Sequence, residues 1–163
     1  MVLIKVSRTA LINPEGAEPK LTVDQMWQGM VIKARKPQEF VKLMEGCEVT
    51  RENEHGLTRI VTFKNGWGPP GGKAEEEIAF HAPMRVDFAM QQTGERISNI
   101  ISTDCDDPSK LYMTFTIEWP HPDLKEGSDE AKEKWQQVHD MTKQIIQSTN
   151  ETVRQMVKDG VVA

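Results

Sequence analysis

The sequence predicts one α+β domain over residues 1–163, in which a curved antiparallel sheet of about six or seven strands wraps around a long C-terminal helix. Two short helices are expected after the first strand. The middle of the chain alternates apolar and polar residues in short runs joined by turn-like sequences, which is typical of an antiparallel meander. The C-terminal part carries an apolar stripe at helical spacing over about thirty residues, or about 45 Å. Such a helix needs an equally long apolar partner, and a curved sheet supplies one while leaving a cavity between them.

The N-terminal elements follow from alternation, capping and proline placement. Val2–Ile12 alternates loosely and predicts the first strand. A helix is expected to begin at Thr22, because Gln25 three residues later completes a capping box. Pro37 ends this helix, and the segment Gln38–Met44 is predicted to form a second short helix.

The meander and the last helix complete the domain. Pro120 and Pro122 are expected to end the last strand, Ser128 to cap the long helix, and Gly160 to stop it. Five or six strands are predicted before that helix, namely Glu48–Glu52, Leu57–Lys64, Ala74–His81, Arg85–Gln92, Ile97–Thr103 and Leu111–Trp119.

Composition and motifs exclude several classes of function. A net charge of −5 argues against a nucleic-acid or anionic-membrane partner, because both favour a basic surface. No apolar run is long enough to span a membrane, and Lys5 and Arg8 interrupt any signal-peptide core, so a cytoplasmic protein is expected. Cys47 and Cys105 match no zinc or redox motif, and no metal or cofactor motif is found elsewhere. We therefore expect no cofactor and no metal, and chemistry that depends on the shape of a pocket.

Several segments carry a family resemblance that covers nearly the whole chain: Leu21–Met30, Lys33–Pro37 with Phe40, Leu57–Arg59, Ile97–Ser102 and Leu111–Trp119. In these segments the chain resembles the START-like, birch-pollen-allergen-like helix-grip fold of the SRPBCC superfamily. More narrowly, it is similar to the acetylaranotin biosynthesis cluster protein L family. This resemblance implies a START-like domain that accepts a small hydrophobic or aromatic metabolite of secondary, polyketide-like metabolism. It implies no catalytic residues, because the superfamily includes carriers, cyclases and oxygenase domains.

Strand alternation predicts which side chains face the cavity. In the last strand all residues of one parity, from Leu111 to Trp119, are apolar. The same rule turns Arg59 and Asn99 inward among apolar neighbours. The predicted ligand contacts are therefore Arg59, Asn99, Phe88, Met90, Ile101, Met113, Phe115 and Trp119, with Trp135 from the helix.

Each polar candidate has a structural and a functional interpretation. Arg59 pairs with an acidic residue, extends to the rim of the cavity or binds a ligand oxygen. Asn99 either bonds to neighbouring backbone or orients a ligand carbonyl. His139 borders the helix stripe, so it is either a solvated residue or an acid or base in the pocket. The run Glu75–Glu77 is interpreted as a solvated strand start or edge.

Three functions remain open. The first is a protein that binds a small hydrophobic or aromatic molecule. The second is a cofactor-independent cyclase, dehydratase or isomerase, in which Arg59 stabilises an oxyanion and Asn99 or His139 guides proton transfer. The third is a protein-interaction module, and a homodimer is a further expectation.

Overall fold

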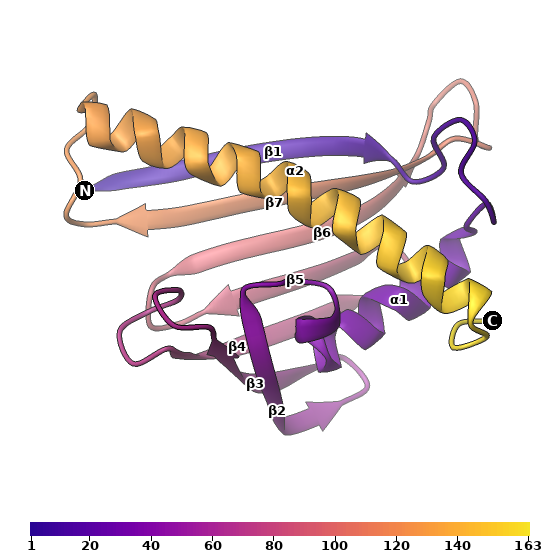
Figure 1. Cartoon of the computed structure of the whole chain (residues 1–163), viewed down its shortest axis with the longest axis horizontal. Helices are drawn as coiled ribbons and strands as arrows, with labels where there is room; N and C mark the ends of the chain where they lie inside the picture. The colour runs from indigo at the N-terminus through magenta and orange to yellow at the C-terminus, as the bar shows by residue number, and fades with distance from the viewer.

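A computed structural model describes all of residues 1–163. Seven strands form one sheet in the order β1-β7-β6-β5-β4-β3-β2, and every neighbouring pair is antiparallel (Figure 1). The elements are β1 Val2–Leu11, α1 Val23–Arg35, the 3-10 turn η1 Pro37–Glu39, β2 Met44–Asn53, β3 Gly56–Phe63, β4 Lys73–His81, β5 Arg85–Met90, β6 Glu95–Thr103, β7 Leu111–His121 and α2 Asp129–Lys158.

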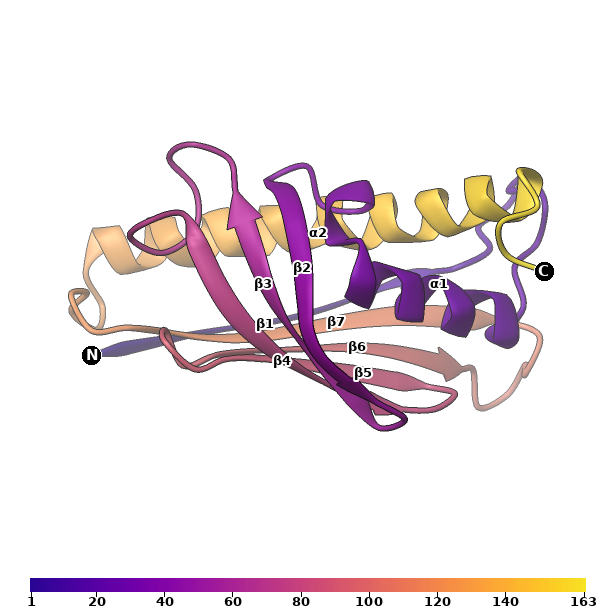
Figure 2. The ribbon, with the colours of Figure 1, turned by 90° about the horizontal axis from the view of Figure 1, so that it is seen from below.

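The sheet curves around α2. The helix packs chiefly on β1 and β7, and β2, β3 and β4 turn up beside it (Figure 2). The predicted helix-grip architecture is thereby confirmed, because one long helix lies against the inner face of a seven-stranded antiparallel sheet. Neither helix combines the length and apolar character that a membrane span requires.

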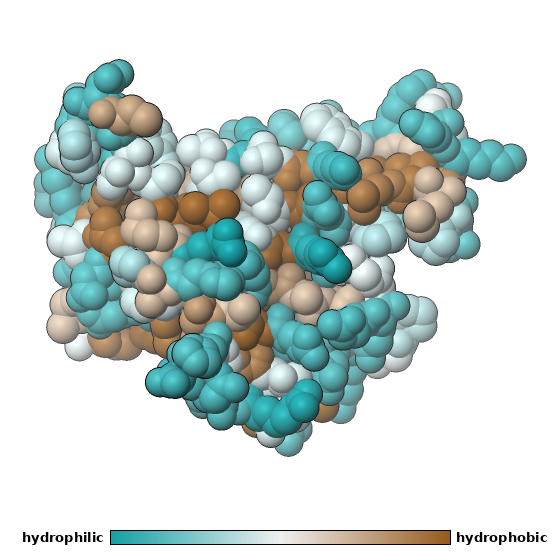
Figure 3. Space-filling model, turned by 180° about the vertical axis from the view of Figure 1, so that it is seen from behind, coloured by the Kyte–Doolittle hydropathy of each residue, from teal (hydrophilic) through white to brown (hydrophobic).

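Burial follows strand parity. On β7 the inward residues Leu111, Met113, Phe115 and Ile117 are buried, and their neighbours along the strand are more exposed. Together with the buried stripe of α2 they form a continuous apolar core. The outer face of the sheet differs, since its apolar patches are broken up by hydrophilic side chains (Figure 3).

The predicted helix caps are present. The Thr22 hydroxyl accepts from the Gln25 backbone N–H at 3.1 Å, and the Gln25 side chain accepts from the Thr22 N–H at 3.0 Å. The Ser128 hydroxyl accepts from the Ala131 N–H at 3.2 Å at the start of α2. After the helix, Gly160 has a φ of +73°, a conformation that suits glycine at a helix C-terminus.

Two predictions of local structure are wrong. The segment Gln38–Met44 is not a helix: η1 is a single turn, and Met44 already pairs with Phe63 as the first residue of β2. A run of seven residues is too short for its apolar pattern to decide between helix and strand. Pro120 does not end β7, because at that point β7 pairs only with β1, so no ladder bond to β6 is lost.

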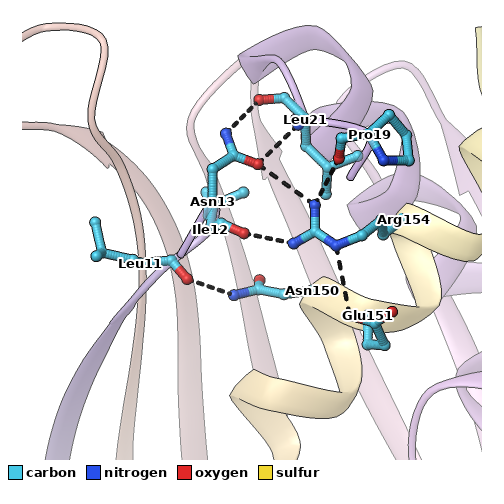
Figure 4. A network of polar contacts seen from close by, with 8 residues as sticks. All are labelled: Leu11, Ile12, Asn13, Pro19, Leu21, Asn150, Glu151 and Arg154. Atoms are coloured by element: carbon cyan, nitrogen blue, oxygen red, sulfur yellow. Dashed lines mark hydrogen bonds and ion pairs between the residues drawn. The ribbon is translucent and has the colours of Figure 1, made fainter. Parts of the chain in front are cut away.

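One buried arginine fixes the connection between β1 and α1 to α2. Arg154 donates to the Ile12 carbonyl at 2.6 Å and to the Pro19 carbonyl at 2.8 Å (Figure 4). The Asn13 side chain bonds to both the N–H and the C=O of Leu21, at 2.8 Å each. This network sets the point at which the chain enters α1 and so positions the residues that α1 turns into the core.

Candidate functional site

Five polar side chains from five different elements meet in the interior. Lys33 comes from α1, Arg59 from β3, Glu76 from β4, Asn99 from β6 and Thr149 from α2, and each is at most 5% exposed. We call these five residues the buried polar cluster. The three strand residues have inward parity, and the two helix residues lie on the apolar faces of α1 and α2.

Arg59 has structural partners on several sides. Its Nε donates to Glu76 Oε2 at 2.7 Å, and Nη2 forms an ion pair with the same oxygen. Its Nη1 donates to the carbonyls of Lys33 and Ala34, at 3.0 and 2.8 Å, in the last turn of α1. The guanidinium carbon lies 5.5 Å from the centre of the Phe88 ring. Arg59 therefore caps the C-terminus of α1, where a positive charge also complements the helix dipole.

Lys33 is a buried amine without a direct carboxylate partner. Its Nζ donates to Asn99 Oδ1 and to Thr149 Oγ1, both at 3.0 Å. Burial, and secondarily the charge of Arg59, lower the pKa of Lys33 to about 7, against an opposing effect of Glu76. The charged and neutral forms of this amine therefore coexist near neutral pH.

Asn99 leaves one polar atom unpaired. Its Oδ1 accepts from Lys33, but its Nδ2 is buried and has no hydrogen-bond partner. A buried N–H without a partner costs about 1–3 kcal/mol, so such a group calls for an explanation. A ligand atom that accepts from Nδ2 would provide one.

The side chains next to the cluster are apolar and only partly covered. Ile97 lies two residues from Asn99 on the same face of β6, and Ile145 lies one turn before Thr149 on α2. Met141 shares the Ile145 side of the helix. We call Ile97, Met141 and Ile145 the apolar strip; all three pack against the core yet stay partly accessible to solvent.

Core side chains from the sheet and from α2 pack against each other where a cavity is predicted. Two hollows lie elsewhere. One, of about 550 Å³, is bordered mostly by outer-face residues of β1, β6 and β7. The other, of about 450 Å³, lies between α1 and the β2–β3 turn, next to Trp27 and Phe80. Neither is lined by a member of the buried polar cluster.

The structure places most of the predicted contact residues in the interior. Phe88, Met90, Ile101, Met113 and Phe115 are all buried in the core. Trp119 is partly buried at one end of the sheet, where Lys134 Nζ lies 4.6 Å from its ring centre.

Trp135, a predicted ligand contact, lies outside this interior, and so does His139, for which the sequence leaves a solvated role and a role in the pocket open. Trp135 is 41% exposed and donates from Nε1 to the Lys5 carbonyl of the edge strand β1 at 3.0 Å. Its ring stacks on His139 at 4.8 Å, and Arg8 donates to the His139 carbonyl at 3.1 Å. The apolar stripe of α2 extends past the sheet edge, so its outermost residues cover that edge instead of facing Arg59 and Asn99.

Sequence reasoning missed Lys33, Glu76 and Thr149. The sequence predicts that Glu75–Glu77 are all solvated, and this is wrong for Glu76, which is 4% exposed. Its parity with Ala74 and Ile78 was the available signal, and the run of three glutamates obscured it. Lys33 and Thr149 sit within apolar helical stripes, a signal that marks them as buried without indicating a partner.

Metal ligands are not gathered anywhere: no group of three His, Cys, Asp or Glu side chains is placed to hold an ion. Cys47 and Cys105 are free thiols. The buried polar cluster itself offers an amine, an amide, a hydroxyl and a paired guanidinium and carboxylate.

Comparisons with known structures agree with this architecture. The crystal structure of the Zhui aromatase/cyclase from Streptomyces superposes with a TM-score of 0.71 at 11% identity, covering 99% of this chain and all of that one. The di-domain aromatase/cyclase StfQ of the steffimycin pathway gives 0.68 at 7% identity, over 96% of this chain and 52% of that one. The protein Ara h 8.0201 gives 0.61 at 10% identity, over 93% and 98% of the two chains. At these identities the likeness concerns the fold.

Sequence comparison identifies the family. The acetylaranotin biosynthesis cluster protein L of Aspergillus terreus is 24% identical over 151 residues, which cover 91% of this chain and 86% of that protein. The sequence profile of the family named after it matches residues 6–160. The chain therefore belongs to the acetylaranotin biosynthesis cluster protein L family.

Proposed function

We propose that the protein binds a small hydrophobic or aromatic metabolite between the sheet and α2, in secondary metabolism. The observation that carries this proposal is the unpartnered Nδ2 of Asn99 at the end of an apolar strip. Small-molecule sites in proteins are mostly apolar and carry a few converging polar groups, and the interior here has this composition. The ligand's ring would lie against Phe88, Met90 and Phe115, and its polar end would meet the buried polar cluster.

Entry of a ligand requires side chains to move, because the interior is packed. Met141 and Ile145 of the apolar strip are the candidates, since both are partly exposed and an unbranched methionine changes rotamer at little cost. The likeness to two aromatase/cyclases supports an aromatic ligand, because the same fold carries that chemistry in those proteins.

The experiment is a thermal-shift screen of naphthalenes, hydroxynaphthalenes, indoles and fatty acids, with native mass spectrometry of the hits. A ligand that binds the native state should raise the melting temperature by several degrees with one-to-one stoichiometry. Asn99→Leu should weaken the response to hits that carry an oxygen. Ser102→Ala, on the outer face of the same strand, is the matched control and should leave the response unchanged. A panel without any one-to-one binder would overturn the proposal.

A second candidate is a cofactor-independent cyclase, dehydratase or isomerase. Lys33 favours it, because an amine with a pKa near 7 is suited to proton transfer at neutral pH. Arg59 is less suited to stabilising an oxyanion, because its nitrogens already have partners. Nε and Nη2 contact Glu76, and Nη1 donates to two carbonyls at the end of α1. Turnover of a bound polyketone that disappears in Lys33→Met and persists in Lys143→Met would support the enzyme over the carrier.

A further inference from the structure

The hydrogen bonds of Lys33 leave one position of its amine open. A neutral amine has two N–H groups and one lone pair. Around Nζ, two of the three positions not bonded to carbon are taken by Asn99 Oδ1 and Thr149 Oγ1, each at 3.0 Å. No other hydrogen bond of Nζ is present, so its third position is open; in the neutral amine whose N–H groups point at these two oxygens, the lone pair lies there.

Asn99 places an open donor beside this open acceptor. Its Oδ1 is occupied by Lys33, and Nδ2, at the other end of the same planar amide, has no partner. A single small amide therefore brings a free donor close to the free lone pair of Nζ. Both side chains are at least nine-tenths buried, so bulk water does not satisfy them freely.

A hydroxyl group complements this pair, because it donates one hydrogen bond and accepts another. We infer that Lys33 and Asn99 together recognise an acidic hydroxyl of the ligand, a phenol or an enol, and that Lys33 takes up its proton. This inference rests on the proposed ligand-binding function and names the chemical class of the ligand.

The charges around Nζ explain why the hydroxyl should be acidic. Arg59 on β3 and Glu76 on β4 form an ion pair with each other, and Thr149 on α2 is uncharged. Glu95 on β6 faces the same interior, and burial, with the nearby charge of Glu76, raises its pKa to about 7. Lys33 therefore lacks a dedicated counter-anion, and a ligand anion would supply it. A phenolate or enolate spreads its charge over a conjugated system, which lowers the cost of burying it.

The proton step is balanced within the complex. The ligand O–H bond breaks, its electron pair stays on oxygen, and the proton forms the third N–H bond of Lys33. The resulting ammonium faces the resulting phenolate or enolate, and Asn99 Nδ2 donates to the same oxygen. The pKa of Lys33 near 7 lies in the range where such acids exchange protons with an amine.

The test uses 4-nitrophenol and its methyl ether 4-nitroanisole, at a pH one unit below the pKa of 4-nitrophenol in water. The wild-type protein should bind 4-nitrophenol about ten- to a hundredfold more tightly than the ether. The bound phenol should also show the absorbance of nitrophenolate, which the free compound at this pH largely lacks. Lys33→Met should abolish this absorbance and the preference, whereas Lys143→Met, on the exposed face of α2, should retain both.

The wild-type measurements alone distinguish failure of hydroxyl recognition from failure of ligand binding, so the test does not depend on a variant that folds. Binding of both probes with equal affinity and without the nitrophenolate band would overturn the hydroxyl inference and leave the proposed function standing. Binding of neither probe would count against the proposed function itself. Tighter binding of 4-nitrobenzoate than of 4-nitrophenol would replace the hydroxyl by a carboxylate and so overturn the assignment.

Discussion

Arg59 illustrates at the residue scale how a charge is held in an apolar interior. Its side chain is 2% exposed, yet it meets Glu76, two carbonyls of α1 and the face of Phe88. An unpaired buried guanidinium would be very costly, so each of these partners offsets part of the desolvation. Glu76 in turn depends on Arg59, because it has no other ion-pair partner.

The Arg59–Glu76 ion pair predicts that removing one partner destabilises the protein more than removing both. Arg59→Met should lower the free energy of unfolding by about 3–5 kcal/mol, because it leaves the Glu76 charge buried and alone. The double variant Arg59→Met/Glu76→Leu should be less destabilised than Arg59→Met, since no isolated charge remains. Urea unfolding at pH 8 measures both, with exposed Arg51→Met as the control. If Arg59→Met is as stable as Arg51→Met, the ion pair does not stabilise the folded protein.

The sequence alone predicts that the Arg59 side chain points into the interior, but not which residue it pairs with. Alternation on β3 turns it inward, as predicted. The partner is set by the register of β3 against β4, which places Arg59 directly opposite Glu76. That register depends on the loop between residues 64 and 72, whose geometry no residue pattern specifies. The same holds for Lys33, because its contact with Asn99 requires the packing of α1 over β6.

At the scale of elements, α1 and α2 approach each other closely at one glycine. A Cβ on Gly29 would lie 2.3 Å from Val153 Cγ2, and Val153 is fully buried. Glycine inside a helix costs about 1 kcal/mol relative to alanine, so its place in α1 needs a reason in packing. The absence of a side chain at Gly29 lets the two helices touch. This close contact helps to bring Lys33 of α1 next to Thr149 of α2.

Gly29→Ala should therefore destabilise the protein by about 1–3 kcal/mol, although alanine is the better helix former. Val153→Ala removes the side chain that the new methyl group would meet. The double variant should lose less free energy of unfolding than the two single variants together, by more than about 0.5 kcal/mol. Urea unfolding of the three variants and the wild type measures this coupling. Additive effects would mean that the helices do not meet at this pair.

Elements with a strong period and clear caps were predictable, and short mixed segments were not. The long helix and its ends at Ser128 and Gly160 follow from the sequence, as does the alternation of the strands. The segment Gln38–Met44 was misassigned because its apolar residues are shared between the core and the start of β2. Trp135 and His139 show a further limit, since a helical stripe does not reveal where the sheet beneath it ends.

At the scale of the whole molecule, the interior holds two titratable groups with opposite effects on stability. Burial raises the pKa of Glu95 to about 7 from 4.5, and burial lowers the pKa of Lys33 to about 7 from 10.5. Folding therefore favours the neutral form of each group. The exposed carboxyls of Asp104 and Asp107 have lowered pKa values through hydrogen bonds, so their stabilisation is lost only at more acidic pH.

These opposite shifts predict a minimum of stability near neutral pH. The contribution of Glu95 is complete below about pH 4.5 and is lost as the pH rises through about 7. The contribution of Lys33 is complete above about pH 10.5 and is lost as the pH falls through about 7. The free energy of unfolding should thus fall between pH 5 and 7 and rise between pH 7 and 10, by of order 1–3 kcal/mol on each side.

Urea unfolding across this pH range measures the free energy of unfolding. Two variants show which group causes the fall and which causes the rise. Glu95→Gln cannot ionise, so it should remove the fall between pH 5 and 7 and leave the rise. Lys33→Met should remove the rise between pH 7 and 10 and leave the fall, whatever its effect on absolute stability. Lys134, which lies near Glu95, lowers the pKa of that carboxyl, so Lys134→Met should deepen the fall. A profile that is flat from pH 5 to 10 in the wild type would mean that neither group is desolvated in the folded protein, and the amine would then lack the neutral form on which hydroxyl recognition depends.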